Sequence, residues 1–516
     1  MRINSKCLFT MTMIYIYLPV FLFIAGWTRV PVAMITIVVC LLFLSRMWKQ
    51  LGEEKTEYLT VQVWTFLLGI LIIAAVCICI GLGGWFSQSG DWYKHNAVLH
   101  DLIDYSWPVI YREREESMLT YYIGQYLLPA LFGKITGSFR FAEIVTCIWG
   151  IGGVFLVYLQ LLMTVRAKGG KKQLLTLFML LLFCGMLLPC QTVLKQIYGD
   201  VMYSAGDYHW LSVESIRLQY RSNLVMLRWV FPQCIVPWLV VLLFWRYREK
   251  TEYYILFMLP VLLFASFSFV GIAAMGIGLT IWHFIYRGDK KEMLRRCFSL
   301  SNLLPGILLG GIFFFYFWGN VKEIKPAYMS FAVQSYSMRT IWVYIIFCLF
   351  MFGIYAGIIW QENKKNPCYY LAVLQLLIIP FFKMGLYNDF VMCTSIPALF
   401  LLELFVIQFL LKETGDETAE KCEKNNIRNV SKDAESRGMR KGILIVCLCI
   451  GIWYPVLELS DNIMAKTPGN MSADGYGTMA NFSDRNNTDI QDDLKYNYYT
   501  YDLEKTFFYR YLAKHH

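Results

Sequence analysis

Long apolar runs recur along almost the whole of this chain. Most are about 17 to 25 residues long, the length that an α-helix needs to cross the hydrocarbon core of a membrane. Hydrophobic residues make up 57% of the 516 residues and charged residues only 16%, too little charge to cover a soluble protein of this size. The sequence therefore predicts an all-α fold, a polytopic bundle of transmembrane helices. The runs are Leu8–Trp27, Val30–Met47, Leu59–Leu82, Met118–Phe132, Ala142–Val165, Gln173–Pro189, Asn223–Trp245, Tyr253–Val270, Gly271–Tyr286, Leu303–Trp318, Thr340–Trp360, Cys368–Lys383, Val391–Leu411 and Gly442–Leu459.

Basic loops between these runs indicate the expected orientation, because loops rich in Lys and Arg stay in the cytoplasm. The basic loops can share that side only if one run between Leu59 and Val165 does not cross. We expect this run to be Met118–Phe132, which is short, contains Pro129 and carries three tyrosines, a residue type enriched at membrane interfaces. About 13 spans then remain, with interfacial helices in the first large outer loop. The basic loops are Arg46–Lys55, Arg166–Lys172, Arg246–Lys250, Arg287–Arg296, Lys364–Lys365 and Lys412–Lys441.

This assignment gives an expected location and an order of regions. We predict an integral protein of a bacterial plasma membrane, with its N-terminus in the cytoplasm and its C-terminus outside the cell. Residues 1–58 hold two N-terminal spans and a cytoplasmic loop, and 59–165 hold the first core span, the outer loop with its juxtamembrane helices and the next span. The rest of the bundle (166–411), a polar and disordered cytoplasmic loop (412–441), the last span (442–459) and an extracytoplasmic tail (460–516) follow.

Net charge and cysteine content exclude two classes of function. The net charge of +10 comes with the basic loops that the positive-inside rule explains, so we expect the lipid bilayer as a partner and no nucleic acid. Most of the 15 cysteines lie inside apolar runs, and none is spaced for a zinc site. The sequence therefore supports neither a disulfide framework nor a structural metal.

The segment Gly90–Tyr111 concentrates aspartate, lysine and histidine directly after the apolar run Leu59–Leu82. Charges are costly in hydrocarbon, so this segment should lie at the outer membrane surface or in a wet cavity. There, a membrane enzyme could bring a lipid-linked reactant and a soluble one together.

A helix over Trp92–Tyr105 would bring Asp91 and His95 onto one face by their four-residue spacing, and would pair His100 with Asp104. The Asp91–His95 pair could hold a divalent cation, or each residue could tune the proton affinity of the other. Pattern alone favours a plainer interpretation, an amphipathic surface helix with solvated charges.

The order of these features resembles the first outer loop of the glycosyltransferase C-fold (GT-C) superfamily, polytopic enzymes that take sugars from polyprenyl-phosphate carriers. In that family a span is followed by an acidic residue just outside it and then by two juxtamembrane helices. The matching segments here are Leu59–Leu82, Asp91 within GDWYKH, Trp92–Tyr105 and Met118–Phe132, roughly the first third of the chain. The resemblance implies that Asp91 is the catalytic base that deprotonates an acceptor hydroxyl. Many members carry an acidic pair at this point, whereas Trp92 follows Asp91 here.

The whole chain also resembles uncharacterised bacterial envelope proteins of this general type. The resemblance implies an integral membrane glycosyltransferase that moves a sugar from a polyprenyl-phosphate carrier to an envelope glycan, lipid or protein on the outer face. The leaving phosphate of such a donor needs cationic or metal stabilisation, so a divalent cation is a candidate cofactor.

Several polar residues on the predicted outer side could bind the substrates. Arg228 lies near the outer end of an apolar run, and a guanidinium matches phosphate oxygens, although it could instead reach the lipid headgroups. Asn388 and Asp389 occupy a short outer loop, where a turn explains them equally well, and we expect Asp389 to face the same chamber as Asp91. The candidate substrate-binding residues are Lys94, His95, Arg228, Asn388 and Asp389, and the other outer cations are Arg112, Arg114, Lys195, Arg217, Arg221 and Lys383.

Two other functions stay open. The first alternative is a non-enzymatic flippase or transporter of polysaccharide or lipid-linked sugar. Glu403 in the middle of a predicted span is the best support for it. Carriers of that kind often contain related halves, and this chain shows no internal repeat. A scaffold subunit without chemistry of its own would leave Asp91, His95 and Asp389 dispersed.

Two further segments carry structural expectations. Pro232 and Pro237 should kink the run Asn223–Trp245, and Gln233 between them should border a cavity or bond a neighbouring helix. The tail after Ser460 is polar and rich in Asn, Asp and Tyr. We expect it to form a small extracytoplasmic cap or a loose extension.

Overall fold

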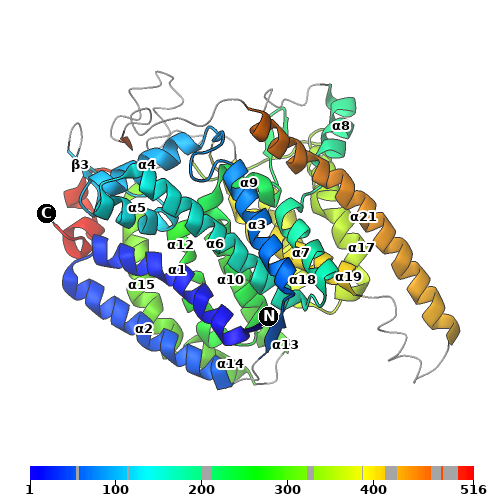
Figure 1. The fold of residues 1–516 in the computed structure, drawn as a ribbon, viewed down its shortest axis with the longest axis horizontal. Coiled ribbons are helices and arrows are strands. Elements are labelled where there is room, and N and C mark those ends of the chain that lie inside the picture. The colour runs from blue at the N-terminus through cyan, green and yellow to red at the C-terminus, as the bar shows by residue number, and fades with distance from the viewer. Residues whose placement is uncertain are drawn as a thin grey trace.

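The computed structural model describes residues 1–53, 57–112, 116–199, 211–286, 289–321, 330–385, 388–412, 427–465, 478–479 and 498–515, with backbone alone at 52–53 and 427–434. The described chain is a bundle of helices, and its strands are short and form only two- and three-stranded sheets in the connections between the helices (Figure 1). The all-α prediction is therefore confirmed.

The first third of the chain contains β1 (Arg2–Asn4), α1 (Ser5–Trp27), α2 (Val30–Glu53), β2 (Tyr58–Thr60), α3 (Val63–Cys79), α4 (Trp92–Asp104), β3 (Ile110–Tyr111), β4 (Ser117–Leu119), α5 (Gly124–Thr136) and α6 (Phe139–Val165). The middle contains α7 (Gly170–Leu182), α8 (Leu187–Tyr198), β5 (Leu211–Val213), β6 (Ile216–Leu218), α9 (Asn223–Trp229), the 3-10 turn η1 (Phe231–Gln233), α10 (Ile235–Arg246), η2 (Thr251–Tyr253), α11 (Tyr254–Met258), α12 (Val261–Phe264), α13 (Ser266–Tyr286), α14 (Lys290–Cys297) and α15 (Leu300–Val321). The last third contains β7 (Ala332–Val333), α16 (Ile341–Cys348), the π-helical turn η4 (Leu349–Gly353), α17 (Ile354–Asn363), α18 (Pro367–Ile378), η5 (Ile379–Phe381), β8 (Phe382–Lys383), α19 (Asp389–Leu411), α21 (Ile427–Met464), β9 (Tyr499–Thr500), η8 (Leu503–Lys505) and η9 (Phe508–Leu512).

Nine helices of the described chain are long and apolar enough to cross a membrane, and a bent pair made of α9 with η1 and α10 is a tenth candidate. The protein is therefore an integral membrane protein with many spans. The candidates are Ser5–Trp27, Val30–Leu51, Phe139–Thr164, Gly170–Tyr198, Ser266–Tyr286, Lys290–Val321, Ile341–Asn363, Asp389–Leu411 and Glu435–Met464, and three shorter apolar helices are Val63–Cys79, Thr251–Phe264 and Pro367–Phe381.

The apolar run Met118–Phe132 does not form a span. Its residues are divided between β4 and α5, and α5 has only 13 residues. At 1.5 Å per residue this helix is about 20 Å long, shorter than the roughly 30 Å of a hydrocarbon core. The predicted helix over Trp92–Tyr105 is also present, as α4.

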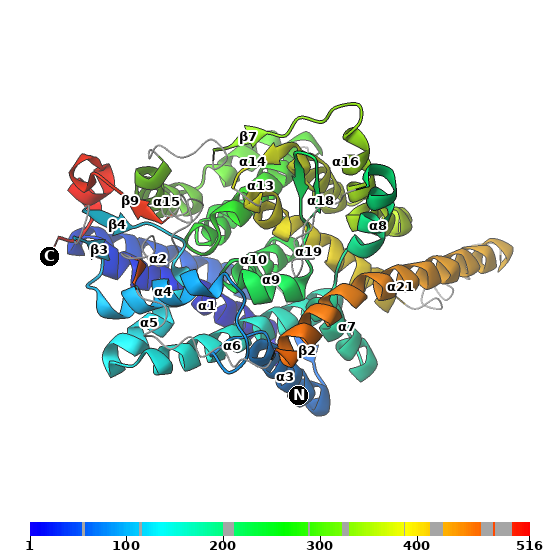
Figure 2. The ribbon, with the colours of Figure 1, turned by 90° about the horizontal axis from the view of Figure 1, so that it is seen from above.

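The helix α21 starts earlier than the sequence suggested. It begins at Ile427 and projects past the rest of the bundle, so the second half of the loop predicted over 412–441 is helical (Figure 2). Arg440 lies in the last charged turn of α21 before the apolar part of that helix. Its guanidinium makes two 2.8 Å bonds to Glu362 at the end of α17. Residues 413–426 of that predicted loop lie outside the described residues.

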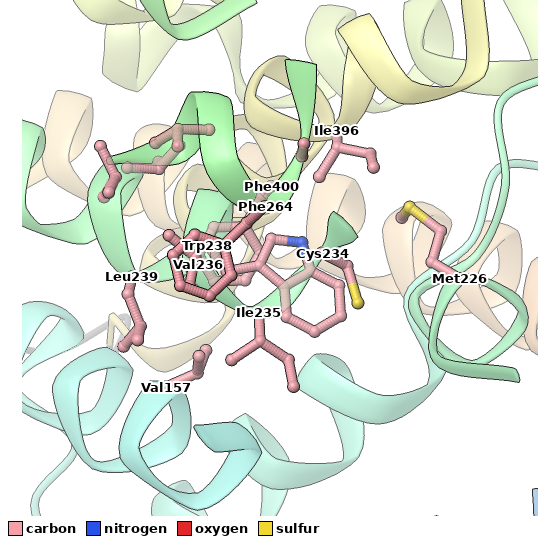
Figure 3. Packing of buried hydrophobic residues seen from close by; sticks show 14 of the residues in the cluster. Val157, Met226, Cys234, Ile235, Val236, Trp238, Leu239, Phe264, Ile396 and Phe400 are labelled. Carbon is pink, nitrogen blue, oxygen red and sulfur yellow. The ribbon is translucent and has the colours of Figure 1, made fainter. Parts of the chain in front are cut away.

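The central helix of the bundle is α19. Its whole apolar window is buried, and α6, α10, α13, α17 and α18 pack around it. Trp238 of α10 stacks on Phe400 of α19 with ring centres 5.5 Å apart, next to Ile235 and to Val157 of α6 (Figure 3). A helix that is apolar on all sides is expected in such an enclosed position.

Connections at the two ends of α1 form two separate groups. At the N-terminal end, Glu57 pairs with Arg246 (2.9 Å) and Arg166 (3.6 Å), which belong to loops predicted to be cytoplasmic. At the other end, Trp27 stacks against Trp107, and Thr28 forms a strand bridge to Ala513 near the C-terminus. The loops predicted to share a side are thus in contact with each other.

The close contact of α13 with α19 generates a prediction. A Cβ atom at Gly271 would lie 2.4 Å from the Thr394 carbonyl oxygen, whereas nothing lies within 4 Å of the same atom at Gly357 in α17. Gly271→Ala should force the helices apart and lower the free energy of unfolding by about 1–3 kcal/mol. Thermal unfolding of the detergent-purified protein measures this, with Gly357→Ala as the control that keeps wild-type stability. Equal melting temperatures for the two variants would contradict the packing.

Candidate functional site

A glycine-rich loop between α3 and α4 sets the position of Asp91. Gly81 and Gly83 adopt positive φ angles of 104° and 81°, which turn the chain back at the end of α3. The side-chain amide of Asn462 in α21 then donates to the carbonyl oxygens of Cys79 (2.5 Å) and Ser87 (3.1 Å). This loop leads directly into α4, and the carbonyl oxygen of Asp91 accepts the first hydrogen bonds of that helix.

The start of α4 is bound to the break in the bent span. The span bends by 116° between its two parts. The last carbonyl groups of α9 therefore cannot bond to a following helical turn. Side chains of the loop and of α4 take their place, because Trp92 Nε1 donates to the Arg228 carbonyl (3.0 Å) and His95 Nε2 to the Trp229 carbonyl (3.2 Å). Trp92 also stacks on Phe231 at the break, with ring centres 5.0 Å apart.

The bend itself confirms one of the two predicted kinks. Pro232 lies in η1 at the break, while Pro237 lies in the first turn of α10, where proline is tolerated. The Gln233 amide donates to the hydroxyl of Tyr122 (2.7 Å), which lies in the segment before α5 and not in a neighbouring helix.

His95 is held in one tautomer. The Trp229 carbonyl can only accept, so Nε2 carries the proton and Nδ1 accepts from the Tyr126 hydroxyl at 2.5 Å. The side chain is buried, and burial lowers the pKa of His95 to about 4. His95 is therefore a neutral residue that joins α4, α5 and the bent span, with both nitrogens in use.

Asp91 and Lys94 form an ion pair at the edge of this buried network. Their charged atoms lie 2.7 Å apart, and the side chains are 31% and 23% exposed. Burial opposes the charge of Asp91, but the charge and hydrogen bond of Lys94 are the main effects that outweigh it, so the pKa of Asp91 lies below its ordinary value. Burial likewise opposes the charge of Lys94, but Asp91 raises the pKa of Lys94 above its ordinary value. The pair stays charged and remains accessible to solvent.

Asp389 and Arg221 lie close enough to this pair to interact with it electrostatically. Asp389 is the first residue of α19, and among the described residues nothing hydrogen-bonds its carboxylate. Arg221 donates from Nε to Gln219 (3.0 Å), while its Nη1 has no hydrogen-bond partner within the described part of the chain. The structure therefore brings two carboxylates and two cations from three distant segments together.

Tyrosines from the connection between β4 and α5 and from the tail border the same cluster. The Tyr121 and Tyr122 hydroxyls are hydrogen-bonded to each other, and the ring of Tyr498 packs on Tyr121 with centres 4.5 Å apart. Burial raises the pKa of Tyr498, and the charge of Lys94 acts against that rise, which indicates that the phenol lies near the ion pair.

Two predicted substrate-binding residues have other partners. Arg228 pairs with Glu458 of α21, and both side chains are largely buried. Asn388 is buried, and its amide donates to the Arg217 carbonyl (2.8 Å) while its oxygen accepts from the Met384 amide (3.3 Å). Both residues hold the structure together, so their roles in substrate binding stay predictions. Lys383 is exposed on β8, and Arg114 lies outside the described residues.

The other acidic residues of α4 are structural. His100 pairs with Asp104 at 3.3 Å, as predicted from their spacing. Asp101 is fully buried and accepts from the Tyr111 hydroxyl (2.6 Å) and from the Met479 amide (2.8 Å).

The described residues contain no group of three or more His, Cys, Asp or Glu side chains placed to hold a metal ion. Because both nitrogens of His95 are already bonded, the predicted Asp91–His95 cation site would require His95 to give up one of these bonds. A divalent cation as cofactor stays a prediction.

Sequence reasoning placed Arg221 among several outer cations and missed Tyr498 altogether. Arg221 lies outside the apolar runs, and Tyr498 comes from a tail whose contacts with α4 and β4 span hundreds of positions of sequence. No local pattern reports such contacts. No protein-family model, no curated protein and no solved structure matches this chain.

The lowered pKa of the buried His95 predicts that the stability of the folded protein depends on pH. The pKa of His95 is about 4 when folded and 6.5 when unfolded, so the unfolded chain binds a proton first as the pH falls. The free energy of unfolding should be fully retained above pH 6.5 and fall by up to about 3 kcal/mol toward pH 4. Melting temperatures between pH 7.5 and 4.5 should show this fall in the wild type and in His100→Gln, and a flatter profile in His95→Gln. Identical profiles for the wild type and His95→Gln would exclude His95 as the source of this pH dependence.

Proposed function

We propose that this protein is an integral membrane glycosyltransferase of the GT-C kind. It transfers a sugar from a polyprenyl-phosphate carrier to an envelope glycan, lipid or protein, and Asp91 is its general base. The observation that carries the proposal is the charged, solvent-accessible carboxylate of Asp91, which pairs with Lys94 and interacts electrostatically with Arg221 and Asp389. Base and phosphate-binding groups are the two kinds of group that this reaction needs.

The proposed reaction is a displacement at the anomeric carbon of the donor. The acceptor hydroxyl oxygen forms a bond to this carbon, the bond from the carbon to the phosphate oxygen breaks, and its electron pair leaves with the carrier phosphate. Asp91 takes the proton of the acceptor hydroxyl. Its lowered pKa keeps Asp91 in the deprotonated form that can accept this proton, and the hydroxyl becomes more acidic as it bonds to the anomeric carbon.

Lys94 and Arg221 are the proposed partners of the leaving phosphate. The free Nη1 of Arg221 offers a donor that no described protein group uses, and a guanidinium matches phosphate oxygens. The carboxylate of Asp389, which no described residue binds, is the proposed acceptor for sugar hydroxyls. Arg228 is not assigned to the phosphate because it and its partner Glu458 are both largely buried, whereas the Lys94–Asp91 pair is accessible to solvent.

The number of membrane crossings and the orientation of the chain are part of the same proposal. The bent span and the three shorter apolar helices would complete the thirteen crossings. The site then opens to the outer face of a bacterial plasma membrane, with α4 and α5 at the interface, the N-terminus in the cytoplasm and the C-terminus outside. A polyprenyl-phosphate headgroup would reach Asp91 at that depth.

A non-enzymatic carrier is the alternative, and Glu403 supports it. This side chain is fully buried in the middle of α19, where Asn223 donates to one oxygen (2.7 Å) and the other oxygen has no described partner. A buried carboxyl group in a span is a common proton site in transporters. The two functions differ in outcome, because a carrier moves the lipid-linked sugar across the membrane without consuming it.

Asp91→Asn should remove the proposed base while keeping the shape of the side chain. We expect the rate of donor consumption to fall by at least about 100-fold, with unchanged membrane insertion. The measurement is the release of polyprenyl phosphate from a panel of short-chain polyprenyl-phosphate hexoses and pentoses, using protein reconstituted in liposomes with envelope acceptors. Asp104→Asn on the same helix, whose carboxylate is 55% exposed and pairs with His100, is the matched control and should keep full activity.

Full activity of Asp91→Asn would overturn the assignment of the base. Transbilayer movement of a labelled lipid-linked sugar without its consumption, abolished by Glu403→Gln and not by Asp91→Asn, would establish the carrier instead.

Arg221→Gln should weaken binding of the donor phosphate. Loss of a charge-assisted hydrogen bond predicts a KM for the donor about tenfold higher or more. Lys383→Gln, which removes an exposed cation elsewhere on the same end of the bundle, should leave this KM unchanged. Initial rates over a range of donor concentrations provide the comparison, and an equal KM for both variants would remove Arg221 from the phosphate site.

A further inference from the structure

The described end of the C-terminal tail is a built part of the fold. Strand β9 pairs with β4, with Thr500 opposite Met118 and Tyr499 opposite Leu119, and forms a three-stranded sheet with β3. The Thr120 amide donates to the Tyr498 carbonyl at 2.7 Å, directly before the turn that leads into α5. The red C-terminal ribbon lies beside α15 and β4 (Figure 2).

Three further parts of the chain hold this tail. Asp101 of α4 accepts from the Met479 amide, and Tyr499 donates to the Met479 carbonyl at 2.5 Å. Asn320 at the end of α15 donates to the Tyr499 carbonyl (2.6 Å). After α1, the guanidinium of Arg29 donates to the carbonyl oxygens of Arg510 (2.7 Å) and Ala513 (3.2 Å).

Tyr498 stands where this tail meets the candidate site. Its side chain is 4% exposed and packs on Tyr121, whose hydroxyl is bonded to that of Tyr122. Four residues further along, Tyr126 bonds His95 on the helix that carries Lys94. Tyr498 is thus packed against the segment that connects β4 to the buried network beneath the Asp91–Lys94 pair.

We propose that the tail segment 498–500 is a fixed part of the candidate site and that Tyr498 is its positioning residue. This rests on the proposed function and adds to it which part of the chain completes the site. Tyr498 fixes Tyr121 and Tyr122, and through them the start of α5 and the bonded pair Tyr126–His95. The tail therefore does not act as a lid that must lift for the substrate to enter.

A disulfide cross-link tests whether the tail is fixed. The hydroxyl oxygens of Thr120 and Thr500 lie 2.7 Å apart, so cysteines at both positions should form a disulfide in the folded, full-length protein. Peptide mass spectrometry of Thr120→Cys with Thr500→Cys detects the bond without any activity assay, and each single variant serves as control. We expect efficient cross-linking and donor consumption within about twofold of the single variants. A tail that must lift would lose its activity when cross-linked and regain it on reduction, and absence of the cross-link would refute the placement of the tail.

Tyr498→Ala tests the positioning role, with Tyr509→Ala as the matched control. Both tyrosines are buried in the tail, but Tyr509 lies beside His515, and the charged groups that act on it are Glu116, Glu504 and Arg112. Misplacement of the base should lower kcat about tenfold in Tyr498→Ala and change the donor KM by less than about threefold. Tyr509→Ala should keep the wild-type kcat even if it lowers the melting temperature by the same amount. An unchanged kcat in Tyr498→Ala would refute the positioning role.

Asp91→Asn is measured in the same experiment to separate the two proposals. If the wild type consumes donor, Asp91→Asn does not, and Tyr498→Ala does at the full rate, only the role of the tail fails. If Asp91→Asn retains full activity, the proposed base fails whatever the tail does.

Discussion

The capping of a broken helix by side chains from the neighbouring helix α4 underlies the arrangement of this protein. The carbonyl groups freed at the 116° bend would be expensive to leave unpaired in a membrane, and Trp92 and His95 satisfy them. The same two side chains fix the first turn of α4, and Asp91 is the residue at its start. The position of the accessible carboxylate therefore follows from the need to complete the hydrogen bonding of the bent span.

The electrostatics of the site follow from that placement. His95 is kept neutral by burial and by its two hydrogen bonds, so it adds no charge beside Asp91. Lys94, one turn along the same helix, stabilises the carboxylate, while Asp389 enters from the start of α19 and Arg221 from the segment before α9. An ion pair with a second carboxylate and a second cation nearby leaves the cluster close to neutral. Such a cluster can bind a phosphate and a sugar together without a large excess of one charge.

Local sequence patterns predicted part of the fold and part of the candidate site. The spacing of charged and apolar residues gave α4 almost to the residue, and the length and tyrosines of Met118–Phe132 excluded a span there. The same reasoning favoured Arg228 over Arg221, because an arginine within an apolar run is notable while its partner Glu458 lies on a helix far along the chain. Tyr498 and the start of α21 at Ile427 were missed for the same reason. The position of Tyr498 and the start of α21 depend on contacts between distant segments. The periodicity of a single sequence carries no information about such contacts.

The enclosure of α19 has a consequence for how the protein is made. This helix follows most of the bundle in the sequence, yet it is surrounded by helices that are synthesised before it. Lipid must occupy its place until the ribosome delivers it, so the earlier helices have to remain loosely associated during synthesis. Final closure of the bundle, and with it the arrival of Asp389 beside Asp91, is then a late event in biogenesis.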